Sequence, residues 1–144
     1  MDSIRIFGYK SFKKLSVQLH PINLLIGANG AGKSNFLSLF EMLANIYEKR
    51  LGAYVAQVGG VDKLLYQGRK VTERIAVNLL TAKREYDLEL LESDGKLIVE
   101  REVVRCYDDV CPLDLVRKNV ITEYQSESSL KDHKEEDLSN YISQ

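Results

Sequence analysis

The sequence predicts an α/β fold with one main domain. Three observations predict it: a short apolar run that leads into a glycine-rich loop, a long amphipathic helix after that loop, and segments of alternating polarity before and after them. The chain has 144 residues, of which 44% are hydrophobic, and this is enough for the core of a single domain. We therefore expect a mixed sheet, one long helix and a β-meander.

The glycine-rich loop fits the pattern G-x-x-x-x-G-K-[ST], which binds the phosphates of a nucleotide. Its glycines permit backbone conformations and a close approach that a Cβ would prevent, so successive N–H groups converge on an anion. The helix that follows turns its positive end to the same place. The predicted nucleotide-binding residues are Gly27, Ala28, Asn29, Gly30, Ala31, Gly32, Lys33, Ser34 and Asn35.

Two side chains of the loop carry the predicted chemistry of a P-loop NTPase. Lys33 is the catalytic candidate, because its ammonium group would reach the β- and γ-phosphates, and Ser34 is the metal candidate, because its hydroxyl would hold a bridging Mg²⁺. A triphosphate is the implied ligand. The alternative, a helix-capping turn with an incidental Lys-Ser, does not explain the order of strand, loop and helix. A dinucleotide-binding fingerprint is disfavoured, because Asn35 stands where its third glycine would be.

The segments around the loop are predicted in order. Strands over 3–9 and 15–19 flank a basic turn, and the apolar run 22–26 has the composition of a buried parallel strand. The helix over 33–50 has apolar residues at intervals of three and four. Lys49 and Arg50 are expected in its last turn, where cations complement the helix dipole.

The second half is predicted to be a meander followed by a tail. One more helical turn over 53–58 precedes strands over 74–80, 84–92 and 97–104, with Asp-Gly at the centre of a hairpin turn. From residue 122 the chain is polar, which predicts a helical or disordered tail. The predicted division has two parts, a P-loop nucleotide-binding lobe over 1–121 and a polar C-terminal tail over 122–144.

Charge and targeting signals limit the function. Residues 1–74 carry 11 lysines and arginines against 5 carboxylates, whereas residues 75–144 carry 9 against 16. A basic first half suits an anion site and could suit nucleic acid, although solvated faces also account for such charges. The N-terminus has no signal-peptide pattern, and no apolar run is long enough to span a bilayer. We expect a cytoplasmic protein without membrane contact, with reduced thiols at Cys106 and Cys111.

Four segments together resemble a known family. They are the turn Tyr9-Lys10-Ser11-Phe12, the run 22–26, the loop 27–35 and the Gly-Gly to Gly-Arg segment 58–69. Over most of residues 1–104 the chain resembles the RecF-like and SMC-like ATPases of the ABC class, and in particular their stand-alone predicted ATPases. The resemblance implies a Walker A loop in an ATPase head and contacts from Lys10 and Ser11 to the nucleotide. The alternative is that the lysines only keep this turn soluble.

The resemblance also indicates what the sequence lacks. Heads of this class place a glutamine near the metal, and Gln57 and Gln67 are the candidates, unless both are ordinary surface amides. Hydrolysis needs a carboxylate for Mg²⁺ and a residue that activates water. The class supplies these as consecutive Asp-Glu after an apolar strand, and adds a Ser-Gly-Gly signature, but the sequence shows neither. Asp108 and Asp109 follow a segment unlike a buried strand and are predicted to be loop acids.

The leading hypothesis is an ATP- and Mg²⁺-binding lobe of a RecF/SMC-like ATPase, with little or no hydrolysis alone. A missing C-terminal lobe or a partner chain would complete it, and a homodimer is a further partner to test. The sequence does not separate a fragment, a truncated product and half of a split enzyme. Complete relatives serve DNA repair, chromosome maintenance or antiphage defence, so DNA is expected only as an indirect partner. The alternatives are another P-loop enzyme, such as a GTPase or small-molecule kinase, and a non-catalytic protein-interaction module.

Overall fold

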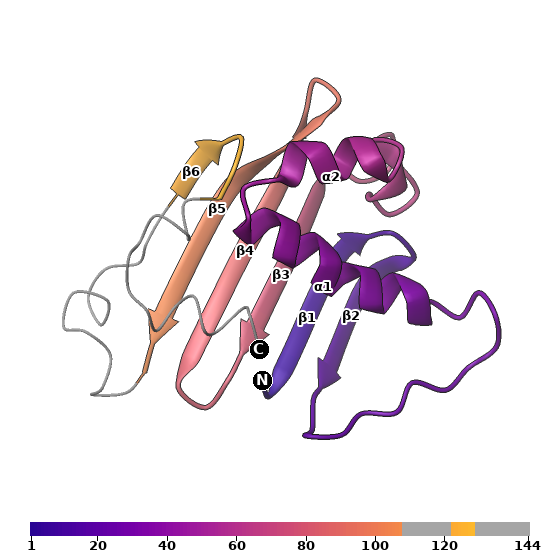
Figure 1. Ribbon diagram of the computed structural model, residues 1–144, viewed down its shortest axis with the longest axis vertical. Coiled ribbons are helices and arrows are strands. Elements are labelled where there is room, and N and C mark those ends of the chain that lie inside the picture. Colours follow the sequence, from indigo (N-terminus) through magenta and orange to yellow (C-terminus); the bar gives the residue numbers. More distant parts are fainter. Residues whose placement is uncertain (108–121, 129–144) are drawn as a thin grey trace.

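In the part of the chain that the structure describes, one antiparallel sheet carries two α-helices on one of its faces (Figure 1). The computed structural model describes residues 1–107 and 122–128. Strand order is β2-β1-β3-β4-β5-β6, and every neighbouring pair is antiparallel. The elements are β1 (Ser3–Tyr9), β2 (Phe12–Gln18), α1 (Lys33–Tyr47), α2 (Leu51–Gln57), the 3₁₀-helix η1 (Val61–Lys63), β3 (Arg74–Leu80), β4 (Arg84–Ser93), β5 (Lys96–Cys106) and β6 (Thr122–Gln125).

The predicted β-meander is confirmed. Strands β3, β4 and β5 follow one another along the sheet, and β3 has the predicted bounds. Asp94 and Gly95, at the β4–β5 turn, both have positive φ, 51° and 77°, as a tight hairpin turn with the right-handed twist of the strands requires. The alternation that predicted these strands therefore also fixes which side chains face the helices.

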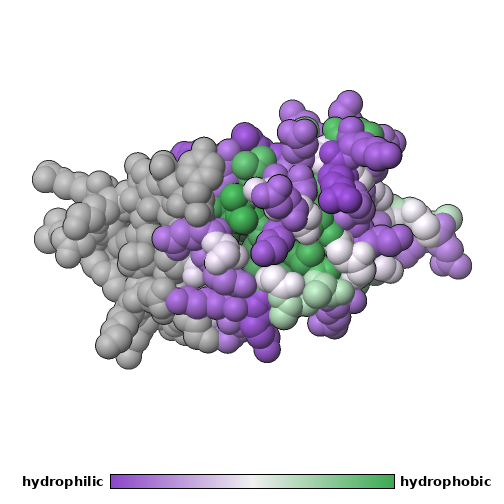
Figure 2. Space-filling view, turned by 90° about the horizontal axis from the view of Figure 1, so that it is seen from above, coloured by the Kyte–Doolittle hydropathy of each residue, from purple (hydrophilic) through white to green (hydrophobic). Residues whose placement is uncertain are grey.

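The core lies between the sheet and the helices. Helix α1 buries one stripe of apolar residues spaced by three and four, and the strands contribute every second side chain opposite to it. Burying each large aliphatic side chain contributes about 1.5–3 kcal/mol relative to leaving it exposed. Seen from the end where α2 lies, apolar residues gather at the centre between hydrophilic margins (Figure 2). Fully buried members include Ile4, Leu39, Met42, Leu51, Leu64, Ile75, Leu90 and Val99.

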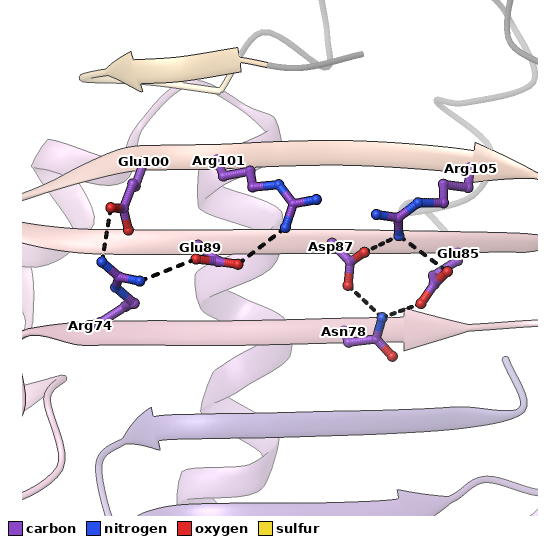
Figure 3. Close-up of polar contacts among 8 residues, drawn as sticks. All are labelled: Arg74, Asn78, Glu85, Asp87, Glu89, Glu100, Arg101 and Arg105. Atoms are coloured by element: carbon purple, nitrogen blue, oxygen red, sulfur yellow. Dashed lines mark hydrogen bonds and ion pairs between the residues drawn. The ribbon is translucent and has the colours of Figure 1, made fainter. Parts of the chain in front are cut away.

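The other face of the sheet is polar. Cross-strand ion pairs run along β3, β4 and β5 (Figure 3). Arg74 lies 2.9 Å from Glu100, and Arg105 contacts both Glu85, at 3.2 Å, and Asp87. Pairs like these, whose side chains remain partly in contact with solvent, contribute little stability each. They do disfavour a one-residue slip of the strands, because such a slip would turn these charged side chains toward the core.

The predicted strand over 22–26 and the predicted mixed sheet are wrong for the part of the chain that the structure describes. The segment between β2 and α1 extends away from the sheet (Figure 1) and pairs with no described strand. Ile22, Leu24 and Ile26 are 89%, 81% and 83% exposed. An apolar run becomes a buried strand only when other strands flank it, and none of the described strands does.

Helix α1 is shorter than predicted. It ends at Tyr47, and Lys49 takes a left-handed φ of 57°, which ends the helical path. Arg50 then precedes the first turn of α2, so neither cation lies in the last turn of α1. The predicted extra helical turn is present as α2.

The C-terminal region differs from the prediction where it is described. Thr122–Gln125 form β6 against β5 rather than a helix or a disordered segment. Cys106 is disulfide-bonded, so the expectation of a reduced thiol there is wrong. Asp108 and Asp109 lie outside the described residues, as does most of the predicted tail, and the division at residue 121 stays a prediction. No helix in the described ranges is long and apolar enough to cross a membrane.

Candidate nucleotide-binding site

The loop before α1 has the bend that its glycines predict. Gly30 and Gly32 have φ of 84° and 95°, in the left-handed region that glycine adopts at little cost. Between them, the N–H of Ala31 donates to the carbonyl oxygen of Ala28 at 3.1 Å and closes a turn. The loop is therefore folded back on itself.

The N-terminus of α1 is open to a ligand. Gly32 precedes its first turn, and the first helical bond runs from the N–H of Phe36 to the carbonyl oxygen of Gly32, at 2.9 Å. No side chain caps this end and no acidic residue lies in the first turn. The first N–H groups of a helix have no intrahelical acceptor, so those of Lys33–Asn35 remain available beside a hollow of about 340 Å³. That hollow is lined by Asn29, Gly30, Gly32, Lys33, Ser34 and Asn35.

Lys33 lies across this loop. Its Nζ donates to the carbonyl oxygen of Gly27 at 2.5 Å and to that of Ala28 at 2.7 Å. An ammonium group has three donors, so one N–H remains for an anion in the hollow. The loop carbonyls thus hold a positive charge where the helix dipole is also positive, and the combination favours a phosphate.

Ser34 is the side chain that could hold a metal. Ser34 is exposed and lines the same hollow. Among residues 1–107 and 122–128, no three His, Cys, Asp or Glu side chains group closely enough to bind a metal ion. One hydroxyl fits a Mg²⁺ site only when the nucleotide phosphates and water supply the remaining oxygens, which is the usual arrangement for this ion.

Lys10 and Ser11 join the β1–β2 turn to α1. Lys10 Nζ donates to Ser38 Oγ at 2.7 Å, and the hydroxyls of Tyr9 and Ser38 are 3.0 Å apart. Asn35 Nδ2 donates to Ser11 Oγ at 3.0 Å. Burial raises the pKa of Tyr9 and lowers the pKa of Lys10. Both predicted residues therefore lie beside the start of α1, where they fix the helix to the sheet.

Phe12 is a site residue that the predicted set lacks. A Cβ on Gly32 would lie 3.1 Å from the Phe12 ring and 3.2 Å from Ser11 Oγ. The end of the loop thus packs directly against the β1–β2 turn, and the aromatic side chain sets its position. The Lys-Ser-Phe sequence of this turn marks Phe12 as a candidate, but sequence spacing alone does not show that its ring packs against Gly32.

The two candidate glutamines lie in different places. Gln67 is exposed, has a positive φ of 56° and lines an open groove that also includes Asn35. Gln57 is exposed at the end of α2 and lines neither that groove nor the hollow. Of the two, only Gln67 lies near the start of α1.

Comparison with known proteins gives the family. A search of curated proteins finds no significant match. The family model described as an AAA ATPase domain matches residues 1–144. An ATPase domain implies nucleotide binding with ATP and commonly Mg²⁺, and the loop and helix described above suit such a ligand. The chain belongs to the AAA ATPase domain family.

Proposed function

We propose that the chain binds ATP with Mg²⁺ through Gly27–Ser34, as the N-terminal lobe of a RecF/SMC-like ATPase. The observation that carries the proposal is the uncapped start of α1 beside the bent loop, with Lys33 held across it by two carbonyl oxygens. These groups place amide donors and one ammonium group around a hollow that contains no carboxylate in its lining. Such a site favours a multiply charged anion.

The residues have distinct roles in this proposal. The amides at the start of α1 bind phosphate oxygens, Lys33 neutralises charge on the terminal phosphates, and Ser34 supplies one oxygen to Mg²⁺. Bound ATP would supply the phosphoanhydride bond that hydrolysis breaks. The Ser11–Asn35 hydrogen bond and the Phe12 contact keep the loop and helix in register with the sheet.

We expect little hydrolysis by this lobe alone. Phosphoryl transfer to water requires a residue that orients or deprotonates the water, and usually a second carboxylate for the metal. Neither group lines the hollow. We propose that a C-terminal ATPase lobe supplies both.

The exposed run 22–26 is the proposed docking segment for that lobe. Ile22, Leu24 and Ile26 are almost fully exposed, and Leu25 is 43% exposed, so apolar side chains project from successive positions of one short segment. A strand with apolar residues on both faces is typical of a sheet buried on both sides. We therefore propose that strands of the C-terminal lobe flank this run and turn it into a central strand.

Equilibrium titration with a fluorescent ATP analogue tests nucleotide binding. Lys33→Ala should weaken binding at least tenfold, because it removes a charge-assisted hydrogen bond that contributes roughly 1.5–3 kcal/mol. Lys14→Ala, which removes the same charge from the opposite face of the sheet, should leave the affinity unchanged. Equal affinity in wild type and Lys33→Ala would remove the assignment.

Two further measurements separate the alternatives. Preferential displacement of the analogue by GTP would favour a GTPase. Thermal melting with and without ATP and Mg²⁺ tests the non-catalytic interaction module, because a ligand that binds only the folded state must raise the melting temperature. No shift at saturating ATP would favour that module.

A further inference from the structure

An open groove lies beside the nucleotide site, between the β1–β2 turn and the segment after α2. Its volume is about 830 Å³, larger than that of the hollow at the loop. Figure 1 shows the turn and the segment at the same end of the sheet. Four cationic side chains, Lys10, Lys63, Arg69 and Lys70, line this basic groove together with one carboxylate, Asp62.

The carboxylate in the basic groove is already satisfied. Asp62 accepts a hydrogen bond from the backbone N–H of Arg69 at 2.9 Å and forms an ion pair with the guanidinium of Arg69 at 3.5 Å. Lys63 and Lys70 are exposed, and neither has an ion-pair partner among the described residues. The net charge of the lining is therefore positive, and the ammonium groups of Lys63 and Lys70 are available to bind an anion.

The frame of the basic groove is held rigidly. The N–H of Lys10 donates to the carbonyl oxygen of Leu64 at 2.7 Å, and that of Tyr66 donates to the carbonyl oxygen of Gly8 at 2.9 Å. These bonds fasten the segment after α2 to the β1–β2 turn. Lys10 and Gln67 both have positive φ, 45° and 56°, a conformation that is unfavourable for a residue with a Cβ.

The lining points to phosphate groups rather than to bases. It contains no aromatic ring, and its one large apolar residue, Leu65, is 2% exposed. Base recognition usually uses aromatic stacking, whereas Lys and Arg side chains in an open groove follow a phosphodiester backbone without reading its sequence. We propose that the basic groove binds the phosphate backbone of a nucleic acid strand directly.

The basic groove adjoins the hollow at the loop, so a bound strand and a bound nucleotide would be neighbours. Asn35 lines both the hollow and the basic groove, and its amide bonds Ser11, which also lines the groove. A strand in the groove would thus contact the start of α1. The nucleic-acid proposal does not depend on ATP binding, because Lys63 and Lys70 lie outside the hollow.

Fluorescence anisotropy with a labelled oligonucleotide of about 20 nucleotides, single-stranded and as a duplex, tests the proposal on the full chain without ATP. The double variant Lys63→Ala/Lys70→Ala keeps the Arg69–Asp62 pair and removes the two ammonium groups. The plot of log affinity against log salt should become shallower by about 2, roughly 1 for each phosphate that is no longer neutralised. The matched variant Lys14→Ala/Lys83→Ala, with the same change in net charge outside the groove, should keep the wild-type slope.

Three outcomes would overturn the proposal. One is the absence of salt-dependent oligonucleotide binding by the wild type. Another is an equal change of slope in both double variants, which would indicate a diffuse charge effect. The third is weaker binding of the ATP analogue by Lys63→Ala/Lys70→Ala with unchanged oligonucleotide binding, which would make the groove a part of the nucleotide site. Loss of ATP-analogue binding in Lys33→Ala bears only on the proposed function.

Discussion

At the scale of single residues, Gly32 is constrained in two independent ways. Its φ of 95° lies in the left-handed region, and a Cβ would press against the Phe12 ring. Gly30 has a similar φ of 84° but open space around the same position. The two glycines therefore separate the cost of backbone strain from the cost of close packing.

We predict that Gly32→Ala destabilises the protein more than Gly30→Ala. A left-handed conformation costs an alanine about 1–2 kcal/mol at either position. At Gly32, the contact with Phe12 adds roughly another 1 kcal/mol or more. Urea unfolding of the two variants measures the difference, and equal costs would show that the loop does not pack against the β1–β2 turn.

At the scale of elements, a buried carboxylate links β4, β5 and the segment after β6. Glu102 is 1% exposed and accepts hydrogen bonds from the hydroxyls of Tyr86, at 2.7 Å, and Ser128, at 2.7 and 2.9 Å. Burial, and next the charge of Glu102, raise the pKa of Tyr86 well above its ordinary value. In the folded state Tyr86 therefore stays protonated at a pH where the same tyrosine is ionised in the unfolded chain.

The pH dependence of unfolding follows from this shift. Because the pKa of Tyr86 is higher in the folded state, its contribution is complete below pH about 10 and falls as the pH rises further. Tyr86→Phe should cost about 1–3 kcal/mol at pH 7, since Glu102 loses a donor, and should give a shallower loss of stability above pH 10. Urea unfolding from pH 7 to 11 checks both, and parallel curves for variant and wild type would contradict the assignment.

The same scale shows what local patterns can and cannot predict. Strands β1 and β3 and the Asp94-Gly95 turn were predictable, because alternation and turn chemistry are properties of neighbouring residues. The loop residues were predictable as a motif. Long-range contacts were not: the carboxylate of Glu127 accepts from the N–H of Leu51 at 2.9 Å, across 76 positions, and no spacing rule reports such a pair. The run 22–26 is a further example. Its composition predicted a buried strand, but whether other strands flank it depends on residues that are distant in the sequence.

At the scale of the whole molecule, the apolar run before the loop is separate from the core. Leu24 is 81% exposed, whereas Leu39 of α1 is fully buried. The described sheet and helices thus form their core without the run, which leaves its side chains for another surface.

This separation predicts opposite results for two leucines. Leu24→Ser should change the free energy of unfolding by less than about 0.5 kcal/mol, as exposed positions do. Leu39→Ala should cost about 2–5 kcal/mol, because it leaves a cavity in the core. Thermal or urea unfolding compares them. A cost above about 2 kcal/mol for Leu24→Ser would mean that the run is buried within the chain itself.

The central claim is that backbone amides at the start of α1 and in the loop bind the phosphates of ATP. The most direct measurement is a ¹⁵N–¹H correlation spectrum of the full chain during titration with ATP and Mg²⁺. We predict that the largest shifts belong to the amides of Gly30, Gly32, Lys33 and Ser34, and that Lys33→Ala strongly reduces them. The account would be contradicted if these four resonances did not shift at saturating ATP, or if only resonances of residues elsewhere shifted.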